Sequence, residues 1–502
     1  MQPLFKRNII FFDPPFILIS LFVPFYNRYY FNCIKLIIFN KILRYFEDFK
    51  LTINKFYNIF YDYRLFIFSL HEEEPLKEKF IKFLLSFNFL SNRILGSLTM
   101  RLTEQIQLPL NKRLSYLCHL AKNLFNLANY YVRQELFYLE SWLRYHDLWY
   151  MLKNKTAYQQ LPSQTAQQVL KLVDHNWKSF FRAMAEWKCH PEKFLNRPKP
   201  PKYKTKNGEY TLIFTNQQCH IREGYLYFPK KTSLSPIKTR IQEPLHQVRI
   251  IPEGLYYLLE IIYEKQQVDL GLNKGRIVGI DIGLNNIVTL VNNAGLQPAI
   301  IKGGVVKSVN QFYNKRIAHY RSKKDKQKIP FETKQLKRLT QKRNNLIKDK
   351  FHKISRSIIN YCMEHDFGSI IIGYNPLWKQ KIKLGKKTTQ QFVQLPFRML
   401  IHYISYKAEL IGIEVRIYEE SYTSICSFLD QEPIQKHSRY SGRRISRGLF
   451  QSQNGTLINA DVNAGYNIIR KALPNAPWVD GIEGVGFHPY CLTFSKGVRM
   501  TE

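Results

Sequence analysis

Closely spaced cysteines are absent from this chain of 502 residues. Its seven cysteines are scattered, and no two of them form a CxxC pair. An odd and scattered set argues against a disulfide framework and favours a reducing compartment, so we expect a cytoplasmic protein. Structural zinc sites are built from closely spaced cysteines or histidines, and this spacing predicts no zinc.

Long apolar runs are absent as well. The longest, from Pro14 to Tyr26, has about 13 residues and holds three prolines, whereas a membrane-spanning helix needs about 20 residues. No small-residue cleavage site follows this run. We therefore expect no membrane partner.

Alanine is missing from residues 1–99, which contain a single glycine and 18 of the 35 phenylalanines. The residues that dominate this segment have codons rich in A and T. Two interpretations stay open: a genuine Phe-rich extension, or upstream DNA translated by mistake, with Met100 as the true start. We expect residues 1–99 to be a miscalled or nonfunctional extension whose deletion leaves activity intact.

Acidic residues are scarce relative to basic ones. The chain has 38 Asp and Glu against 75 Lys and Arg, for a net charge of +37. Such a surplus favours nucleic acid as the partner, because each neutralised phosphate releases counterions. A basic membrane-surface or ribosomal protein is the alternative.

The pattern from residue 100 onward predicts a β-rich module with a helical insertion. Residues 100–112 read as an alternating strand, and residues 113–194 carry apolar residues at helical spacing. Residues 195–270 hold turn residues and short strands, and we expect them to complete the module begun by 100–112. The segment RPKPPKYKTK within them is predicted to be a basic linker.

Residues 271–472 predict a second, α/β domain. Three strands occupy 272–303, and a basic helical pair at 306–364 is divided at Pro330. The strand FGSIIIGYN, a helix, the strand IGIEVRIYEES and a final helix follow. Residues 473–502 form a tail.

Three acidic sites stand out in this domain. Asp281 lies in the apolar strand VGIDIGLNNIVTL, the pair Glu419 and Glu420 lies in the last strand at YEESYTS, and Asp461 lies in INADVNAGYNI. A carboxylate in an apolar strand is costly unless it is paired or binds a metal. In a strongly basic chain, widely spaced carboxylates favour a metal-dependent enzyme acting on a polyanion, as in two-metal nucleases. Mg²⁺ takes oxygen ligands, so we expect two Mg²⁺ ions held by Asp281, Glu420 and Asp461.

The order of strands and helices, with acids on the first strand, the last strand and the final helix, is that of an RNase H-like (RuvC) domain. From Met100 to Ile469 the chain resembles the TnpB family of transposon-encoded proteins, often described as transposases. The resemblance is carried by GIDIGLNNIVTL, WKQ at 378–380, YTS at 422–424 and NADVNAGYNIIR. The last of these motifs is the most specific.

The resemblance implies an RNA-guided DNA endonuclease. Its guide RNA would come from the transposon, its target would be double-stranded DNA, and the β-rich part would be a wedge-like module carrying a helical recognition insertion. The alternative is a guided DNA-binding protein that no longer cuts. A third interpretation, a transposase that joins DNA ends, has no separate support in the sequence.

Two departures from the family pattern matter. Most members carry the second acid on the fourth strand, where this chain has Gly373. We expect Glu420 to substitute for it, as in the related eukaryotic Fanzor group, and we expect strand alternation to turn Glu419 away. The family also has a four-cysteine zinc ribbon after YTS, where this chain has only Cys426 and a basic segment with Arg443, Arg444 and Arg447.

Overall fold

A computed structural model of the chain describes residues 99–376, 385–479, 484 and 488–492. The expectations for residues 1–98, for the WKQ motif and for most of the tail lie outside the described residues. Of the helices within them, none has the length and apolarity needed to cross a bilayer. Their six cysteines are free thiols.

The first half of the described chain is built on an antiparallel sheet in the order β1-β7-β6-β2. Strand β1 (Thr99–Leu108) pairs with β7 (Tyr257–Gln266) over its whole length, and its residues alternate between exposed and partly buried. Strands β6 (Leu245–Pro252) and β2 (Leu212–Thr215) complete the sheet. A smaller sheet joins three short strands, β3 (His220–Arg222), β4 (Tyr225–Tyr227) and β5 (Ile237–Lys238).

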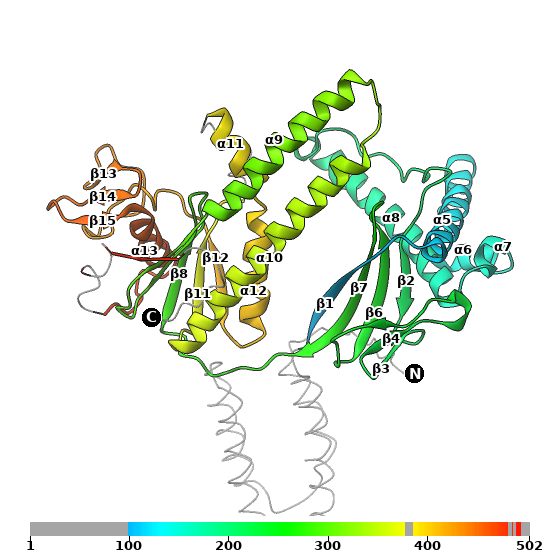
Figure 1. Ribbon diagram of the computed structural model, residues 1–502, viewed down its shortest axis with the longest axis horizontal. Helices are drawn as coiled ribbons and strands as arrows, with labels where there is room; N and C mark the ends of the chain where they lie inside the picture. The colour runs from blue at the N-terminus through cyan, green and yellow to red at the C-terminus, as the bar shows by residue number, and fades with distance from the viewer. Residues whose placement is uncertain (1–98, 377–384, 480–483, 485–487, 493–502) are drawn as a thin grey trace, which may run out of the picture. The chain divides into compact units, whose positions relative to one another are not determined.

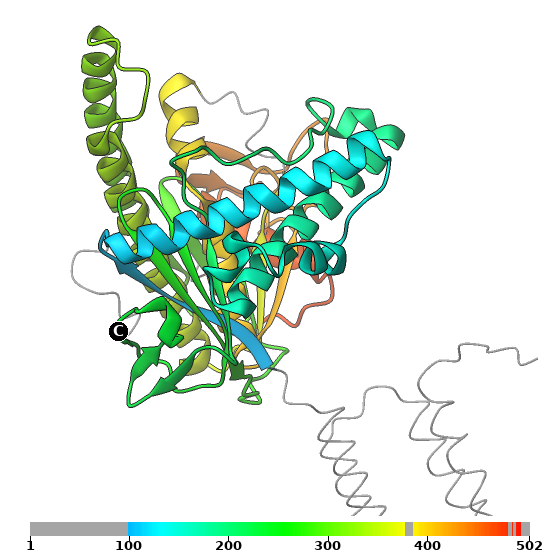
Figure 2. The ribbon, with the colours of Figure 1, turned by 90° about the vertical axis from the view of Figure 1, so that its right-hand side faces the viewer.

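Four helices separate β1 from β2. They are α5 (Lys112–Tyr138), α6 (Tyr145–Leu152), α7 (Thr156–Gln159) and α8 (Ser163–Cys189). The Asn111 side chain caps α5, which runs as one uninterrupted helix (Figure 2). Helix α5 packs on α8, and the buried Trp177 Nε1 donates to Asn129 Oδ1 at 2.9 Å. Single 3-10 turns follow at η2 (Pro191–Lys193) and η3 (Lys230–Thr232).

The second half is a mixed α/β arrangement around a six-stranded sheet, which confirms the class expected from the sequence. The strand order is β12-β11-β8-β9-β10-β16. Strands β8 (Ile277–Asp281), β9 (Asn286–Asn292) and β10 (Ala299–Lys302) form an antiparallel meander. Strands β11 (Ser369–Gly373) and β12 (Glu414–Tyr418) run parallel to β8, and β16 (Tyr490–Leu492) pairs parallel with β10.

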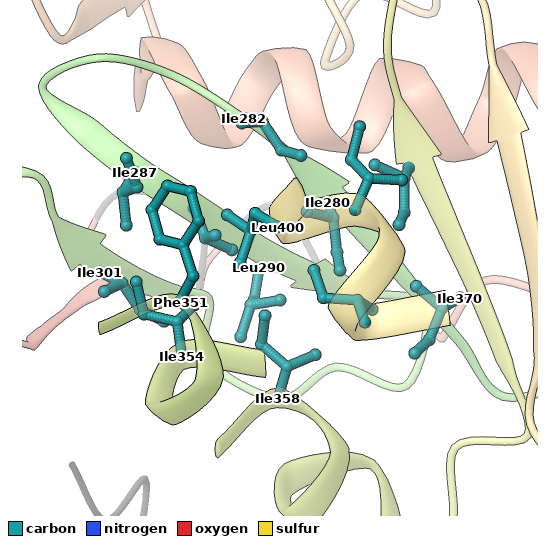
Figure 3. Close-up of a cluster of buried hydrophobic side chains, with 14 of the residues drawn as sticks. Ile280, Ile282, Ile287, Leu290, Ile301, Phe351, Ile354, Ile358, Ile370 and Leu400 are labelled. Carbon is teal, nitrogen blue, oxygen red and sulfur yellow. The ribbon is translucent and has the colours of Figure 1, made fainter. Parts of the chain in front are cut away.

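Helices cover both faces of this sheet (Figure 1). One face carries α9 (Gly304–Lys326), α10 (Lys334–Glu364), α11 (Lys386–Gln394) and α12 (Phe397–Glu409), and the other carries α13 (Ala460–Ala472). Figure 3 shows the first core, in which Phe351, Ile354 and Ile358 of α10 meet Ile280 and Leu290 of the sheet. Because strand side chains alternate, Ile277 and Ile371 face the second core under α13.

Helix α13 lies unusually close to the sheet because glycine occupies the contact. A Cβ atom built on Gly279 of β8 would lie 2.6 Å from Ile469 Cγ1, and one on Gly465 of α13 would lie 3.0 Å from the Val291 side chain. Side chains at these positions would push the helix away from the strands.

A third small sheet lies in the chain between β12 and α13, where the sequence predicted only a basic segment. Its strands are β13 (Arg443–Ser446), β14 (Leu449–Gln451) and β15 (Leu457–Asn459), paired antiparallel. Phe450 and Ile458 anchor it in the core under α13, whereas all four residues of β13 are exposed.

Candidate active site

Asp281 ends β8, near the centre of the six-stranded sheet and at the edge where the parallel strands β11 and β12 also end. Its side chain is partly buried. Burial raises the pKa of this carboxyl well above its usual range, and the nearby charges of Glu420 and Asp461 raise it further. Arg444 acts in the opposite direction. In the structure, therefore, the charges of Glu420 and Asp461 both act on the carboxyl of Asp281.

Glu420 reaches this site from the turn that follows β12. The strand ends at Tyr418, so the strand alternation expected for Glu419 and Glu420 does not apply. The turn instead fixes Glu420 through its backbone N–H, which donates to Asn375 Oδ1 at 3.2 Å. Burial and the charge of Glu419 raise the pKa of Glu420 to about 7, against the opposing effect of Lys471.

Glu419 forms an ion pair with Lys471. Its side chain is half exposed and accepts from Lys471 Nζ at 2.6 Å and from the backbone N–H of Ser421 at 2.9 Å. The two neighbouring glutamates thus have different environments, and only Glu420 interacts with Asp281.

Asp461 enters from the first turn of α13. The side chain of Asn459 caps the helix and accepts from the backbone N–H of Asp461 at 3.0 Å. The helix dipole favours a negative charge at this end. One oxygen, Oδ2, accepts from Asn286 Nδ2 at 2.6 Å, and the other, Oδ1, lies 3.4 Å from the Arg444 guanidinium.

Gly373, where most family members carry an acid, ends β11 beneath α13. A Cβ atom there would lie 2.4 Å from Ile468 Cδ1 and 2.9 Å from Glu420 Oε2. The carboxylate of Glu420 therefore fills space that a side chain at position 373 would need.

Two buried asparagines of α13 hold the loop that follows Glu420. Asn467 Nδ2 donates to the carbonyls of Thr423 and Cys426, and Asn463 both donates to Cys426 O and accepts from the backbone N–H of Phe428. Each of these contacts is 3.0 Å or shorter. The asparagines of NADVNAGYNIIR thereby fix the loop and Asp461 to one helix.

The donor chemistry suits a hard divalent cation. Carboxylate oxygens are the ligands that Mg²⁺ prefers. Burial first, and neighbouring carboxylates second, raise the pKa values of Asp281 and Glu420. Within the residues that the structure describes, however, no group of three or more His, Cys, Asp or Glu side chains converges tightly enough to enclose a metal ion. The carboxylates interact through their charges but do not form a closed cage.

Two further residues at the site were not assigned to it from the sequence. Asn286 lies five residues after Asp281 in the same motif, and its place on the adjacent strand β9 could have been used to find it. In the sequence, Arg444 is one of the arginines in a basic segment. Its contact with Asp461 depends on the small sheet β13-β14-β15, which the sequence analysis did not predict.

Comparisons with known proteins agree with the sequence motifs. Residues 260–378 match the family OrfB_IS605, described as "Probable transposase", and residues 397–468 match "Cas12f1-like, TNB domain". The TnpB-like protein ORF457 of Acidianus two-tailed virus is 22% identical over 416 residues, which cover 72% of this chain and 84% of that protein.

A second relative is the CRISPR-associated endodeoxyribonuclease Cas12f2 of Micrarchaeota archaeon (strain CG1_02_47_40). It is 27% identical over 324 residues, 60% of this chain, and the match spans only about half, 54%, of the relative's own length.

Solved structures give weaker matches. The Cas12f1-sgRNA-target DNA complex matches with a TM-score of 0.32 and 15% identity, covering 74% of this chain and 100% of that one. The mini-RNA-guided endonuclease CRISPR-Cas_phi3 matches with a TM-score of 0.40 and 10% identity, covering 74% and 92%. The two family matches and the TnpB-like relative confirm the resemblance to the TnpB family that the motifs predicted.

Proposed function

We propose that the chain is a transposon-associated, RNA-guided DNA endonuclease whose RNase H-like (RuvC) domain spans residues 271–472. The observation that carries the proposal is that Asp281, Glu420 and Asp461, from three separate segments, lie near enough to one another for the charges of the other two to act on Asp281. The family resemblance supports the reaction class, and one relative is named an endodeoxyribonuclease.

In this proposal Asp281, Glu420 and Asp461 hold Mg²⁺, which when bound activates water and stabilises the leaving oxygen of the scissile phosphodiester. Neighbouring side chains of the protein hold these carboxylates in place. Asn286 and the cap of α13 orient Asp461. Lys471 pairs with Glu419, and its positive charge opposes the effect of Glu419 on Glu420. Arg444 is the cation nearest to Asp461 and is half exposed, so it is able to contact a phosphate.

The proposed partners are a guide RNA from the transposon and a double-stranded DNA target. The net charge of +37 supports polyanionic partners. So do the exposed basic faces of α9 and α10, in which cations dominate between Lys315 and Lys353. A guided DNA-binding protein that does not cut is the second candidate, and the absence of a carboxylate at Gly373 favours it.

The test is cleavage of a target plasmid by the full chain copurified with RNA expressed from its own locus. We expect cleavage with Mg²⁺, none with EDTA, and none from Asp281→Ala or Asp461→Ala, which should keep RNA and DNA binding because they remove no phosphate contact. Guided binding by the parent protein without cleavage would support the second candidate. Undiminished cutting by Asp281→Ala would contradict the proposed site.

A further inference from the structure

The segment RPKPPKYKTK, residues 197–206, reads as a linker in the sequence, but the structure holds it in place. We call it the basic strap. It follows η2 and lies along α5 without helix or turn between Arg197 and Lys204. Three prolines stiffen its first half, because proline fixes the backbone angle φ and favours extended chain.

The strap is held by side chains of α5 that follow one another at helical spacing. Arg133 and Asn129 both donate to the carbonyl of Pro201, at 2.9 and 3.2 Å. Asn126 bonds the backbone of Lys204 twice, donating to its carbonyl at 2.9 Å and accepting from its N–H at 2.8 Å. The strap therefore runs antiparallel to α5 in a fixed register.

The last contact of this series uses a buried cation. Lys122 is 4% exposed, and its Nζ donates to the carbonyl of Lys206 at 2.6 Å. Within the part of the chain that the structure describes, no carboxylate lies within ion-pair distance of Lys122. A buried ammonium without a counterion is costly. It adds positive potential beneath the strap, which an anion bound above it would offset.

With the strap backbone tied to α5, its charged side chains remain accessible to solvent. Arg197, Lys199, Lys202, Lys204 and Lys206 are exposed, and no acidic residue interrupts them. An extended chain rises by about 3 Å per residue. Lys202, Lys204 and Lys206 therefore place three exposed cations within a short length of chain, as binding to a row of phosphates requires.

Aromatic rings accompany the cations. Tyr203 is 47% exposed, and the guanidinium of Arg133 lies 5.4 Å from its ring centroid. Lys204 lies 4.9 Å from the centroid of Tyr210. An exposed tyrosine between lysines is suited to stack on an unpaired base. A base paired inside a duplex is already stacked on its neighbours and is not accessible to the tyrosine ring.

We propose that the basic strap binds the backbone of a single-stranded stretch of nucleic acid, with Tyr203 stacking on a base. The inference rests on the proposed function only in its choice of partner, since it requires nucleic-acid binding but no cleavage. The ordered backbone matters because a strap fixed before binding loses less conformational freedom than a mobile linker.

The test measures binding, not cutting. Full-length Asp281→Ala protein is titrated with labelled oligouridylate RNA in EDTA across a range of salt concentrations. Adding Lys199→Gln, Lys202→Gln and Lys206→Gln together should weaken binding about tenfold or more and reduce the salt dependence of log K by about 2, from ~0.7 per phosphate contact. The matched control replaces Lys155, Lys171 and Lys188, exposed lysines of the α6–α8 region, by Gln.

The control should lose far less affinity, although its net charge is the same. Equal losses in both triple variants would overturn the proposal, because they would reflect net charge alone. A loss as large for duplex DNA as for single strands would overturn the single-strand assignment. Thermal melting of each variant shows whether it is folded.

A second variant isolates the ordering of the strap. Asn126→Ala changes no charge but removes both hydrogen bonds to Lys204. It should weaken binding severalfold and leave the salt slope unchanged. Unchanged affinity would show that α5 does not order the strap for binding. Because no arm measures cleavage, a noncutting protein would leave this test intact.

Discussion

At the scale of single residues, the site depends on the burial and neighbouring charges of its carboxylates and on the lack of a side chain at Gly373. Asp281 and Glu420 have raised pKa values because burial and like charges oppose their ionisation, and the groups that lower these values are Arg444 and Lys471. A bound divalent cation would favour the ionised forms of both. Gly373 contributes by lacking a side chain, since the Glu420 carboxylate lies where that side chain would be.

Gly373→Ala therefore tests whether that space matters. The added methyl would lie 2.9 Å from Glu420 Oε2 and 2.4 Å from Ile468 Cδ1, so both side chains must shift. We expect cleavage to fall by about 100-fold, the effect of a misplacement on the order of 1 Å. Single-turnover cleavage and thermal melting measure activity and packing separately.

The matched control is Gly373→Ala combined with Ile468→Val, which removes Cδ1, the closest atom, and leaves the 3.0 Å contact with Cγ1. This double variant should regain much of its melting temperature while cleavage stays low. Full recovery of cleavage would mean that the glycine serves only the packing of α13.

Among the helices and strands, those recognisable from the residue pattern within their own segment were predicted from the sequence. The apolar strands, the helical pair divided at Pro330 and the acid on β8 follow from hydrophobic periodicity and from the rarity of an acid in a buried strand. The turn that sets Glu420 could not be predicted in the same way, because β12 ends two residues earlier. Its geometry depends on Asn375 after β11 and on the asparagines of α13.

The contact between α10 and α12 contains a buried lysine that sequence periodicity did not identify. Lys407 is 6% exposed, and its Nζ donates to His352 O at 2.8 Å and to Ser355 Oγ at 2.6 Å. Burial, and secondarily the charge of Arg356, lower the pKa of Lys407 to about 8. The folded state thus opposes the charge that the unfolded chain keeps up to about pH 10.5.

Lys407→Met should therefore stabilise the protein at pH 7, by about 1 kcal/mol once the two lost hydrogen bonds are subtracted. Ser355 Oγ keeps a partner because it also donates to His352 O. As pH rises from about 8 toward 10.5, the parent releases this proton only when folded and gains stability, so the difference should shrink. Urea unfolding at both pH values measures it. Destabilisation at pH 7 would show that the hydrogen bonds outweigh the burial of charge.

For the whole molecule, composition and motifs predicted a basic nucleic-acid enzyme of the TnpB family but not how its distant segments meet. The basic strap reads as a linker because the residues that hold it lie on α5, 68 to 84 residues earlier in the chain. Arg444 reads as one charge in a basic segment because its position depends on the β13-β14-β15 sheet. Both contacts join segments that are distant in the chain, and a single sequence does not show which distant segments lie together.

The central claim is that Glu420 supplies the carboxylate missing at Gly373, and the most direct test is single-turnover cleavage by the RNA-bound protein at saturating Mg²⁺. Glu420→Gln should lower the rate by three orders of magnitude or more, a barrier increase above about 4 kcal/mol at 1.36 kcal/mol per decade. Glu419→Gln, which changes the neighbouring carboxylate that pairs with Lys471, should have a much smaller effect. Equal rates for both variants and the parent, or loss of activity only in Glu419→Gln, would contradict the account.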